Sequence, residues 1–115
     1  MRHTQIVSFD MDGTLTESHV QLILERHQVW GDTIHIVTSR NPMFEWPDIF
    51  QELCVEYSIP KENVHFTNQQ LKLETLLKIG SNLHYDDDLI EVDDINTNGG
   101  ESIRALLVDY IHKYK

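Results

Sequence analysis

The sequence predicts an α/β protein: a mostly parallel central sheet between two layers of helices, in a three-layer Rossmann-like arrangement. Short apolar runs alternate with helix-like segments along the 115 residues, which is typical of βαβ units. Three of these runs end in acidic or hydroxyl side chains, as expected where parallel strands present their carboxyl ends at one edge of a sheet. We expect residues 1–115 to form a single domain, because this length supplies one core and the sequence contains no internal repeat or linker.

Four short apolar runs predict strands, and a fifth segment is a weaker candidate. The runs are rich in β-branched and aromatic residues and are bounded by turn residues. In chain order the expected strands cover residues 5–10, 34–37, 64–66 and 82–85, with a fifth short strand in 91–97.

Apolar residues at helical spacing predict four helices. In chain order they cover residues 17–29, 47–57, 68–79 and 101–114. Pro47 is typical of a helix start, Asn68 can cap the third helix, and Gly80 is well placed just after its end. The last helix follows the turn at Gly99-Gly100 and rests on the spacing of Ile103, Leu106, Leu107 and Ile111.

The composition limits the class of partner. Lys and Arg total 9 against 19 Asp and Glu, a formal net charge of −10 that disfavours nucleic acid and anionic membranes as partners. No apolar run approaches the roughly 20 residues that span a bilayer, and the N-terminus lacks a signal-peptide pattern. Cys54 is the sole cysteine, so no internal disulfide is possible and a cytoplasmic setting is expected. The seven histidines are scattered and form no zinc set.

The most informative string is Asp10-Met11-Asp12-Gly13-Thr14, directly after the first expected strand. Two carboxylates held close together are unfavourable unless a cation or a reaction needs them. A nucleophilic aspartate beside a carboxylate that transfers protons can take a phosphoryl group from an oxygen. Gly13 permits the tight backbone that turns a loop over such a site. The alternative is a surface turn with the same residues.

Functional side chains also follow two other expected strands. Thr38 and Ser39 end the second strand, where a hydroxyl can donate to a phosphate oxygen or satisfy the loop backbone. Arg40 is either a substrate contact or a solvated side chain. Asp86 and Asp87 end the fourth strand and offer the hard oxygen ligands that Mg²⁺ prefers, with a solvated acidic loop as the alternative.

On these residues the chain resembles the haloacid dehalogenase (HAD) superfamily of phosphotransferases, whose first motif is Asp-x-Asp-Gly-Thr/Val after the first strand. The resemblance implies a HAD-type fold in which Asp10 is the nucleophile and Asp12 the general acid and base. It implies that Thr38, as the second motif, is also catalytic. The substrate-binding residues would be Gly13, Thr14, Ser39 and Arg40.

The third motif of the superfamily is a lysine, for which Lys72 and Lys78 compete. Lys72 lies at the start of its expected helix, on the side where a phosphate would bind. Lys78 lies near the helix C-terminus, where the helix dipole favours any cation. We therefore expect Lys72 to neutralise charge on the phosphate as a catalytic residue.

The fourth motif is an acidic pair after an apolar strand, and Asp86 with Asp87 resembles it. Three consecutive aspartates also allow the pair Asp87 and Asp88, and Asp87 with Glu91 fits a variant whose second acid comes four positions later. The resemblance implies a bound Mg²⁺, held by Asp10, Asp12, Asp86 and Asp87.

Together these motifs imply a Mg²⁺-dependent phosphatase that acts through an aspartyl phosphate on a phosphomonoester, either a small molecule or a nucleotide. The segments between Asp12 and Thr38 and between Thr38 and Lys72 are too short for a cap domain. We therefore expect an open site, which a large substrate or an oligomer partner could close.

Two alternatives stay open at this point. One is a phosphatase of nucleic-acid 3′ ends, since residues 66–87 look somewhat like the corresponding part of polynucleotide kinase-phosphatases, although the net charge disfavours it. The other is a non-catalytic Mg²⁺-binding or phospho-receiver-like domain. A receiver would carry its acceptor aspartate on a middle strand, whereas the strand at 64–66 ends in Phe66-Thr67.

Overall fold

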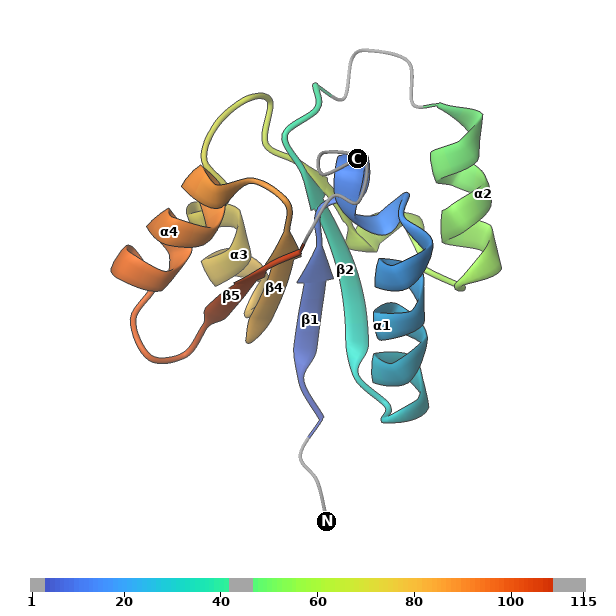
Figure 1. Ribbon diagram of the computed structural model, residues 1–115, viewed down its shortest axis with the longest axis horizontal. Helices are drawn as coiled ribbons and strands as arrows, with labels where there is room; N and C mark the ends of the chain where they lie inside the picture. The colour runs from blue at the N-terminus through green and yellow to red at the C-terminus, as the bar shows by residue number, and fades with distance from the viewer. Residues whose placement is uncertain (1–3, 42–46, 109–115) are drawn as a thin grey trace.

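Five short parallel strands form the centre of the molecule, with helices on both faces (Figure 1). The structure, a computed structural model, describes residues 4–41 and 47–108. The strands are β1 (Ile6–Phe9), β2 (Thr33–Thr38), β3 (Val64–Phe66), β4 (Leu83–Asp86) and β5 (Arg104–Leu107). The helices are α1 (Ser18–Val29), α2 (Asp48–Glu56), α3 (Leu73–Ile79) and α4 (Leu89–Asn98). This is the predicted three-layer Rossmann-like architecture, and the described residues contain no cap domain.

The two faces of the sheet carry separate apolar clusters, because successive strand residues point to opposite sides. On one face, Phe9 and Ile36 pack with residues of α1 and α2, among them Leu24. On the other face, Val37 of β2 and Ala105 of β5 pack with residues of α3 and α4, among them the fully buried Leu76. Each helix pair therefore covers one face.

The strand order β3-β2-β1-β4-β5 places a topological switch point between β1 and β4. The chain moves outward from β1 to β2 and β3, then returns past β1 to β4 and β5 (Figure 1). In open α/β sheets, ligands bind outside the carboxyl ends of the strands at such a point. Asp10 directly follows β1 and Asp86 ends β4, so both carboxylates lie at this crevice.

The segment after α4 is a strand, so the helix predicted over 101–114 is wrong for its described part. Ile103 and Ala105 are buried while Arg104 between them is exposed, the alternation of a half-buried strand. The open edge of β4 supplies this segment with backbone partners, a long-range pairing that a local helical spacing cannot reveal. Residues 109–114 of the expected helix lie outside the described residues.

The short strand predicted in 91–97 is also wrong, because these residues belong to α4. The Asp88 side chain caps this helix by accepting a hydrogen bond from the backbone N–H of Ile90 at 2.9 Å. Val92 and Ile95 are buried three positions apart, on the face of α4 that covers the sheet.

Helix α3 begins later than the predicted cap at Asn68. Asn68 and Gln69 adopt positive φ values of 52° and 68°. Their backbone N–H groups donate to the carbonyls of Arg40 and Ser39, at 3.3 Å and 2.7 Å. The loop is thereby tied to the end of β2, and Lys72 takes the position just before the helix.

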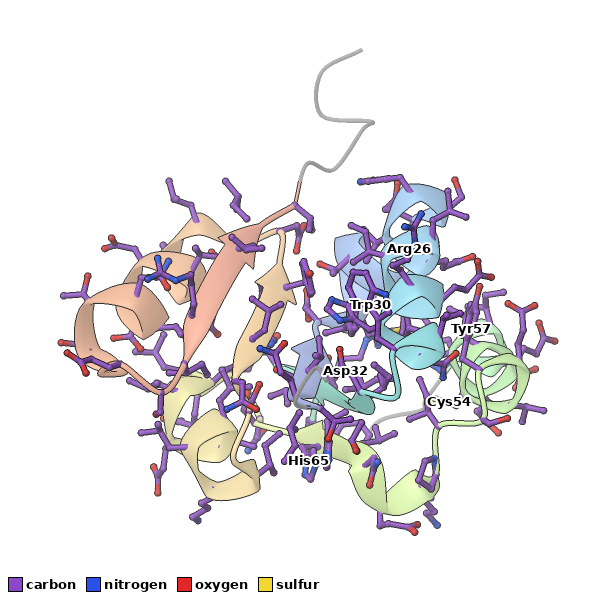
Figure 2. The ribbon with its side chains drawn as sticks, turned by 90° about the horizontal axis from the view of Figure 1, so that it is seen from below. Arg26, Trp30, Asp32, Cys54, Tyr57 and His65 are labelled. Atoms are coloured by element: carbon purple, nitrogen blue, oxygen red, sulfur yellow. The ribbon has the colours of Figure 1, made fainter. Side chains whose placement is uncertain are left out.

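A buried polar network joins α1 to the sheet. Asp32, labelled in Figure 2, lies just before β2 and contacts Nδ1 of His27 at 2.8 Å. Its other oxygen accepts the backbone N–H of Gln5 at 2.9 Å. Because a carboxylate only accepts, Nδ1 carries the proton. Nε2 of His27 lies 2.9 Å from the hydroxyl of Tyr85, which completes the network.

We predict that Asp32→Ala lowers the free energy of unfolding by roughly 2–4 kcal/mol, because it leaves His27 and the N–H of Gln5 without their acceptor. Urea denaturation followed by circular dichroism measures the loss. The control is Asp93→Ala, at an exposed position of α4, which should change stability by no more than about 0.5 kcal/mol. Equal stabilities of the two variants would contradict the prediction.

The fold also brings together two of the scattered histidines, which the sequence analysis does not anticipate. The register of β2 and β3 places His35 and His65 on one face of the sheet, and Nδ1 of His35 lies 3.0 Å from Nε2 of His65. Figure 2 labels His65 at this position. Burial lowers the pKa of both rings, and for His35 the neighbouring ring lowers the pKa further.

This pair predicts a loss of stability in acid. Protonation favours the unfolded chain, whose histidines titrate near the ordinary value of 6.5, so the contribution is complete above that pH and falls as the pH drops below it. Between pH 7.5 and 5.5 we expect the urea midpoint of the wild type to fall more than that of the double variant His35→Gln/His65→Gln. Equal decreases would show that the pair does not contribute.

Candidate active site

A buried lysine joins the two strand ends at the switch point. Nζ of Lys72 lies 2.9 Å from Oδ1 of Asp10 and 2.6 Å from Oδ2 of Asp86. All three side chains are at least nine-tenths buried. A cation between two buried carboxylates compensates charges that would otherwise be costly to remove from water.

The pKa values of Asp10 and Asp86 shift in opposite directions. Burial raises the pKa of Asp10 well above its ordinary range, and the charge of Lys72 offsets only part of this effect. Burial acts on Asp86 as well, but the hydrogen bond from His84 and the charge of Lys72 outweigh it and lower the pKa. For Lys72 itself, the two carboxylates outweigh burial and raise the pKa, so the ammonium stays charged.

A row of buried polar groups continues from Asp86 into the sheet. Nε2 of His84 lies 2.9 Å from Oδ2 of Asp86, and Nδ1 lies 2.7 Å from the hydroxyl of Ser8, which in turn contacts Ser81 at 2.8 Å. Burial lowers the pKa of His84, so its ring is neutral. Because the carboxylate only accepts, Nε2 carries the proton and Ser8 donates to Nδ1. His84 therefore fixes the orientation of Asp86, a role that the sequence analysis misses.

The loop after β1 leaves room for a second carboxylate at the site. Gly13 has φ 72°, and a Cβ there would lie only 2.5 Å from Oδ2 of Asp87. A side chain at position 13 would therefore clash with Asp87 as well as strain the backbone. The hydroxyl of Thr14 lies 3.4 Å from an oxygen of Asp10 and 3.4 Å from one of Asp87, and it can donate to one of them at a time.

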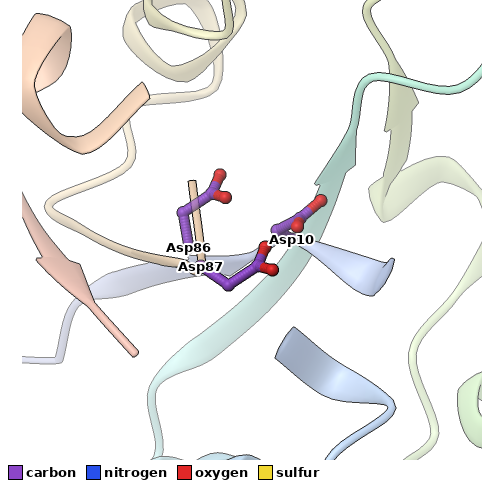
Figure 3. Close-up of side chains that lie close together, drawn as sticks. All are labelled: Asp10, Asp86 and Asp87. Atoms are coloured by element: carbon purple, nitrogen blue, oxygen red, sulfur yellow. The ribbon is translucent and has the colours of Figure 1, made fainter. Parts of the chain in front are cut away.

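Asp10, Asp86 and Asp87 together offer a divalent cation a set of oxygen ligands. One carboxylate oxygen from each lies within 4.8 Å of the others, and Figure 3 shows the three side chains close together. Hard oxygens from a few carboxylates, with room for substrate and water, match the preference of Mg²⁺. The cradle that Gly13 leaves open also fits such a site, because it allows the carboxylate of Asp87 to approach the loop.

The structure places the two candidate lysines, and the three consecutive aspartates, in different surroundings. Lys72 contacts Asp10, whereas Lys78 is 76% exposed on α3 and pairs with Glu74 at 3.8 Å. Asp86 and Asp87 gather beside Asp10, whereas the Asp88 side chain caps α4. The geometry therefore places Lys72, Asp86 and Asp87 beside Asp10, and their catalytic and metal-binding roles stay predictions.

The two hydroxyl residues at the end of β2, Thr38 and Ser39, occupy different positions. Thr38 is buried, and its Oγ1 accepts the backbone N–H of Arg40 at 3.3 Å, the contact expected of a hydroxyl that supports a loop. Ser39 lines the cavity above the aspartates, together with Gln69 of the facing loop.

Arg40 contacts Asp12 rather than solvent alone. Its Nε and one terminal nitrogen donate to the two oxygens of Asp12, at 2.8 Å and 2.9 Å. The guanidinium lies 4.9 Å from the ring centre of Phe50 in α2, a cation–π contact. Both charged side chains are partly exposed, so Asp12 lies at the mouth of the site while Asp10 lies at its floor.

Glu91 supports Lys72 through the backbone. Its carboxylate, on α4, accepts the backbone N–H of Lys72 at 3.1 Å, and burial raises its pKa. The sequence analysis weighs Glu91 only as an acid of the fourth motif. In the structure it anchors the start of α3, a contact between residues that no sequence spacing connects.

A cavity of about 680 Å³ lies outside the strand ends, and Asp10, Asp12 and Lys72 are among the residues that line it. This volume lies within the range of small-molecule sites, roughly 300–1,000 Å³. Its floor is formed by Asp10, Lys72, Asp86 and Asp87.

A scan against family models and a search of curated proteins found no significant match to this sequence. No helix in the described part of the chain is long and apolar enough to cross a membrane.

Two histidine substitutions test the buried polar row. We predict that His84→Leu lowers the free energy of unfolding by roughly 1–3 kcal/mol, because Asp86 loses a hydrogen-bond donor and Ser8 an acceptor. His19→Leu is the control, since neither buried ring nitrogen of His19 has a hydrogen-bond partner among the residues that the structure describes. It should leave stability unchanged or raise it. Urea denaturation measures both, and a more damaging His19→Leu would contradict the assignment.

Proposed function

We propose that this protein is a Mg²⁺-dependent phosphatase that hydrolyses phosphomonoesters through an aspartyl phosphate on Asp10. The proposal rests above all on one observation: Lys72 bridges Asp10 and Asp86 at the floor of a cavity at the topological switch point. The resemblance of the motifs around these residues to the HAD superfamily supports the same reading.

In the first step, a carboxylate oxygen of Asp10 attacks phosphorus and the bond from phosphorus to the alcohol oxygen breaks. Asp12 donates a proton to the departing oxygen, so that an alcohol leaves. In the second step, Asp12 takes a proton from a water molecule, which attacks phosphorus. The bond from phosphorus to Asp10 then breaks, which releases inorganic phosphate, frees the Asp10 carboxylate and leaves Asp12 protonated for the next turnover.

The remaining residues hold charge and position. Lys72 faces the nucleophile with a fixed positive charge, which stabilises the phosphoryl oxygens in the transition state. Mg²⁺ held by Asp10, Asp86 and Asp87 would add the positive charge that keeps Asp10 ionised despite burial. Arg40 holds Asp12 at the mouth of the cavity, and this pair has to open before Asp12 reaches a leaving oxygen.

Two observations weigh against the alternatives. The order β3-β2-β1-β4-β5 differs from the 2-1-3-4-5 order of flavodoxin-like folds, in which receiver domains carry their acceptor. The acidic lining and the net charge of −10 oppose a nucleic-acid backbone. The strand order therefore weighs against a receiver domain, and the charge weighs against a nucleic-acid substrate.

The decisive experiment is hydrolysis of an aryl phosphate by the purified protein. We expect turnover with Mg²⁺, none with EDTA, and a decrease of at least about 10³-fold in Asp10→Asn, which removes the nucleophile. Asp93→Asn, on the exposed face of α4, is the matched control and should retain full activity.

Acid quenching during turnover should trap a phosphorylated protein in the wild type and none in Asp10→Asn. Turnover that persists in Asp10→Asn, or that is insensitive to EDTA, would refute the proposed mechanism. No turnover at all in a folded protein that binds Mg²⁺ would refute the phosphatase proposal.

A further inference from the structure

Four apolar side chains line the cavity although they are largely exposed. Leu71 is 54% exposed, Leu89 64%, Ile90 72% and Leu107 46%. Isolated exposed apolar residues are ordinary on a protein surface. These four instead share one cavity with the aspartates, and an apolar surface with a polar rim is typical of a binding site.

The four apolar residues lie on the β4 side of the cavity, where Asp87, Asp88 and Glu91 also line it. The four come from the loop before α3, the first turn of α4 and the end of β5, which Figure 1 shows together on the β4 side of the sheet. The polar side chains of Asp12 and Ser39 approach from the β1 and β2 side. A ligand whose phosphate lies over Asp10 and Lys72 can therefore place its organic part on apolar side chains.

The charges of the lining restrict what else the ligand can carry. Among the described residues that line the cavity, Lys72 is the single basic one, against the carboxyl groups of Asp10, Asp12, Asp86, Asp87, Asp88 and Glu91. A cation at the aspartates and Lys72 can balance one phosphate. Arg40 at the mouth of the cavity is paired with Asp12, so a second phosphate or a carboxylate on the ligand would meet mainly negative charge.

We infer that the cavity selects phosphomonoesters of uncharged, apolar alcohols, alkyl or aromatic, whose organic group packs on Leu71, Leu89, Ile90 and Leu107. The inference rests on the proposed phosphatase function and names its substrate class. Polyhydroxylated sugar phosphates, bisphosphates and nucleoside polyphosphates are correspondingly poor substrates.

A series of straight-chain alkyl phosphates, from ethyl to hexyl, tests the inference, because the reactivity of the leaving group changes little along the series. We expect kcat/KM to rise about two- to fourfold for each added CH₂, as expected for partial to full burial of a methylene group. Hexane-1,6-diol bisphosphate, which has the same chain and a second phosphate, should be a poorer substrate than hexyl phosphate.

Two variants locate the effect. Ile90→Ser changes the most exposed of the four side chains and should reduce the advantage of hexyl over ethyl phosphate by about threefold or more. Leu71→Ser provides a second variant should Ile90→Ser fail to fold. Leu77→Ser is the matched control, because Leu77 is 48% exposed on α3 and does not line the cavity.

Binding of alkylphosphonates, which cannot be hydrolysed, separates this inference from the proposed function. Calorimetry should show tighter binding of hexylphosphonate than of ethylphosphonate, and Ile90→Ser should reduce the difference. This result would support the inference even if no phosphate ester were hydrolysed. Hydrolysis of all alkyl phosphates at equal kcat/KM would leave the phosphatase standing and overturn the inference. Sedimentation showing a dimer that Ile90→Ser dissociates would also overturn it, because a second copy would then cover the surface.

Discussion

The ion triplet of Asp10, Lys72 and Asp86 is the interaction on which the rest of the site depends. Two carboxylates end neighbouring strands in a buried crevice, where their repulsion is far stronger than in water. Removing one member of such a group leaves an uncompensated buried charge, which is strongly destabilising.

The positive charge of this triplet, Lys72, lies just before α3 and not on a strand, so the loop before α3 has to be held in place. The bond from Glu91 to the backbone of Lys72 and the bonds from the loop to the end of β2 hold it there. The start of α3 is thus determined by charge balance at the switch point rather than by a local cap.

The polar row of His84, Ser8 and Ser81 occupies a layer that is normally apolar, since parallel sheets are buried on both faces. Each group has a partner, so the row avoids the penalty of unsatisfied buried polar atoms. The row helps to fix the orientation of Asp86. Oδ2 of Asp86 accepts hydrogen bonds from Nε2 of His84 and Nζ of Lys72, and its Oδ1 accepts the backbone N–H of Asp88. The carboxylate has little freedom to rotate, and the position of any cation beside it is correspondingly defined.

Much of this arrangement could be predicted because it follows from sheet geometry. Carboxyl ends of parallel strands meet at one edge, which brings Asp10 and Asp86 together without any knowledge of contacts. Gly80 ends α3 with φ 73°, as its position in the sequence predicts. The contacts of Glu91 and His84 could not be predicted, because each joins elements through pairings that local patterns do not encode. The same limit explains β5: Leu106 and Leu107 fit a helical spacing, and only the free edge of β4 makes that segment a strand.

The contrast in burial between the two aspartates of the first motif fits a division of roles under the proposed function. Asp10 is buried and bound to a buried lysine, whereas Asp12 is half exposed and paired with a partly exposed Arg40. Exposed pairs of this kind contribute about 1 kcal/mol or less, so they open readily. A phosphate dianion that enters the cavity can compete for Arg40 and thereby free Asp12, while the pair at Asp10 stays closed.

A nucleophile has to be fixed to attack in line, and a group that first donates and then accepts a proton has to move between two oxygens. Placing the first on a strand end and the second on the exposed turn of the loop meets both requirements with adjacent residues.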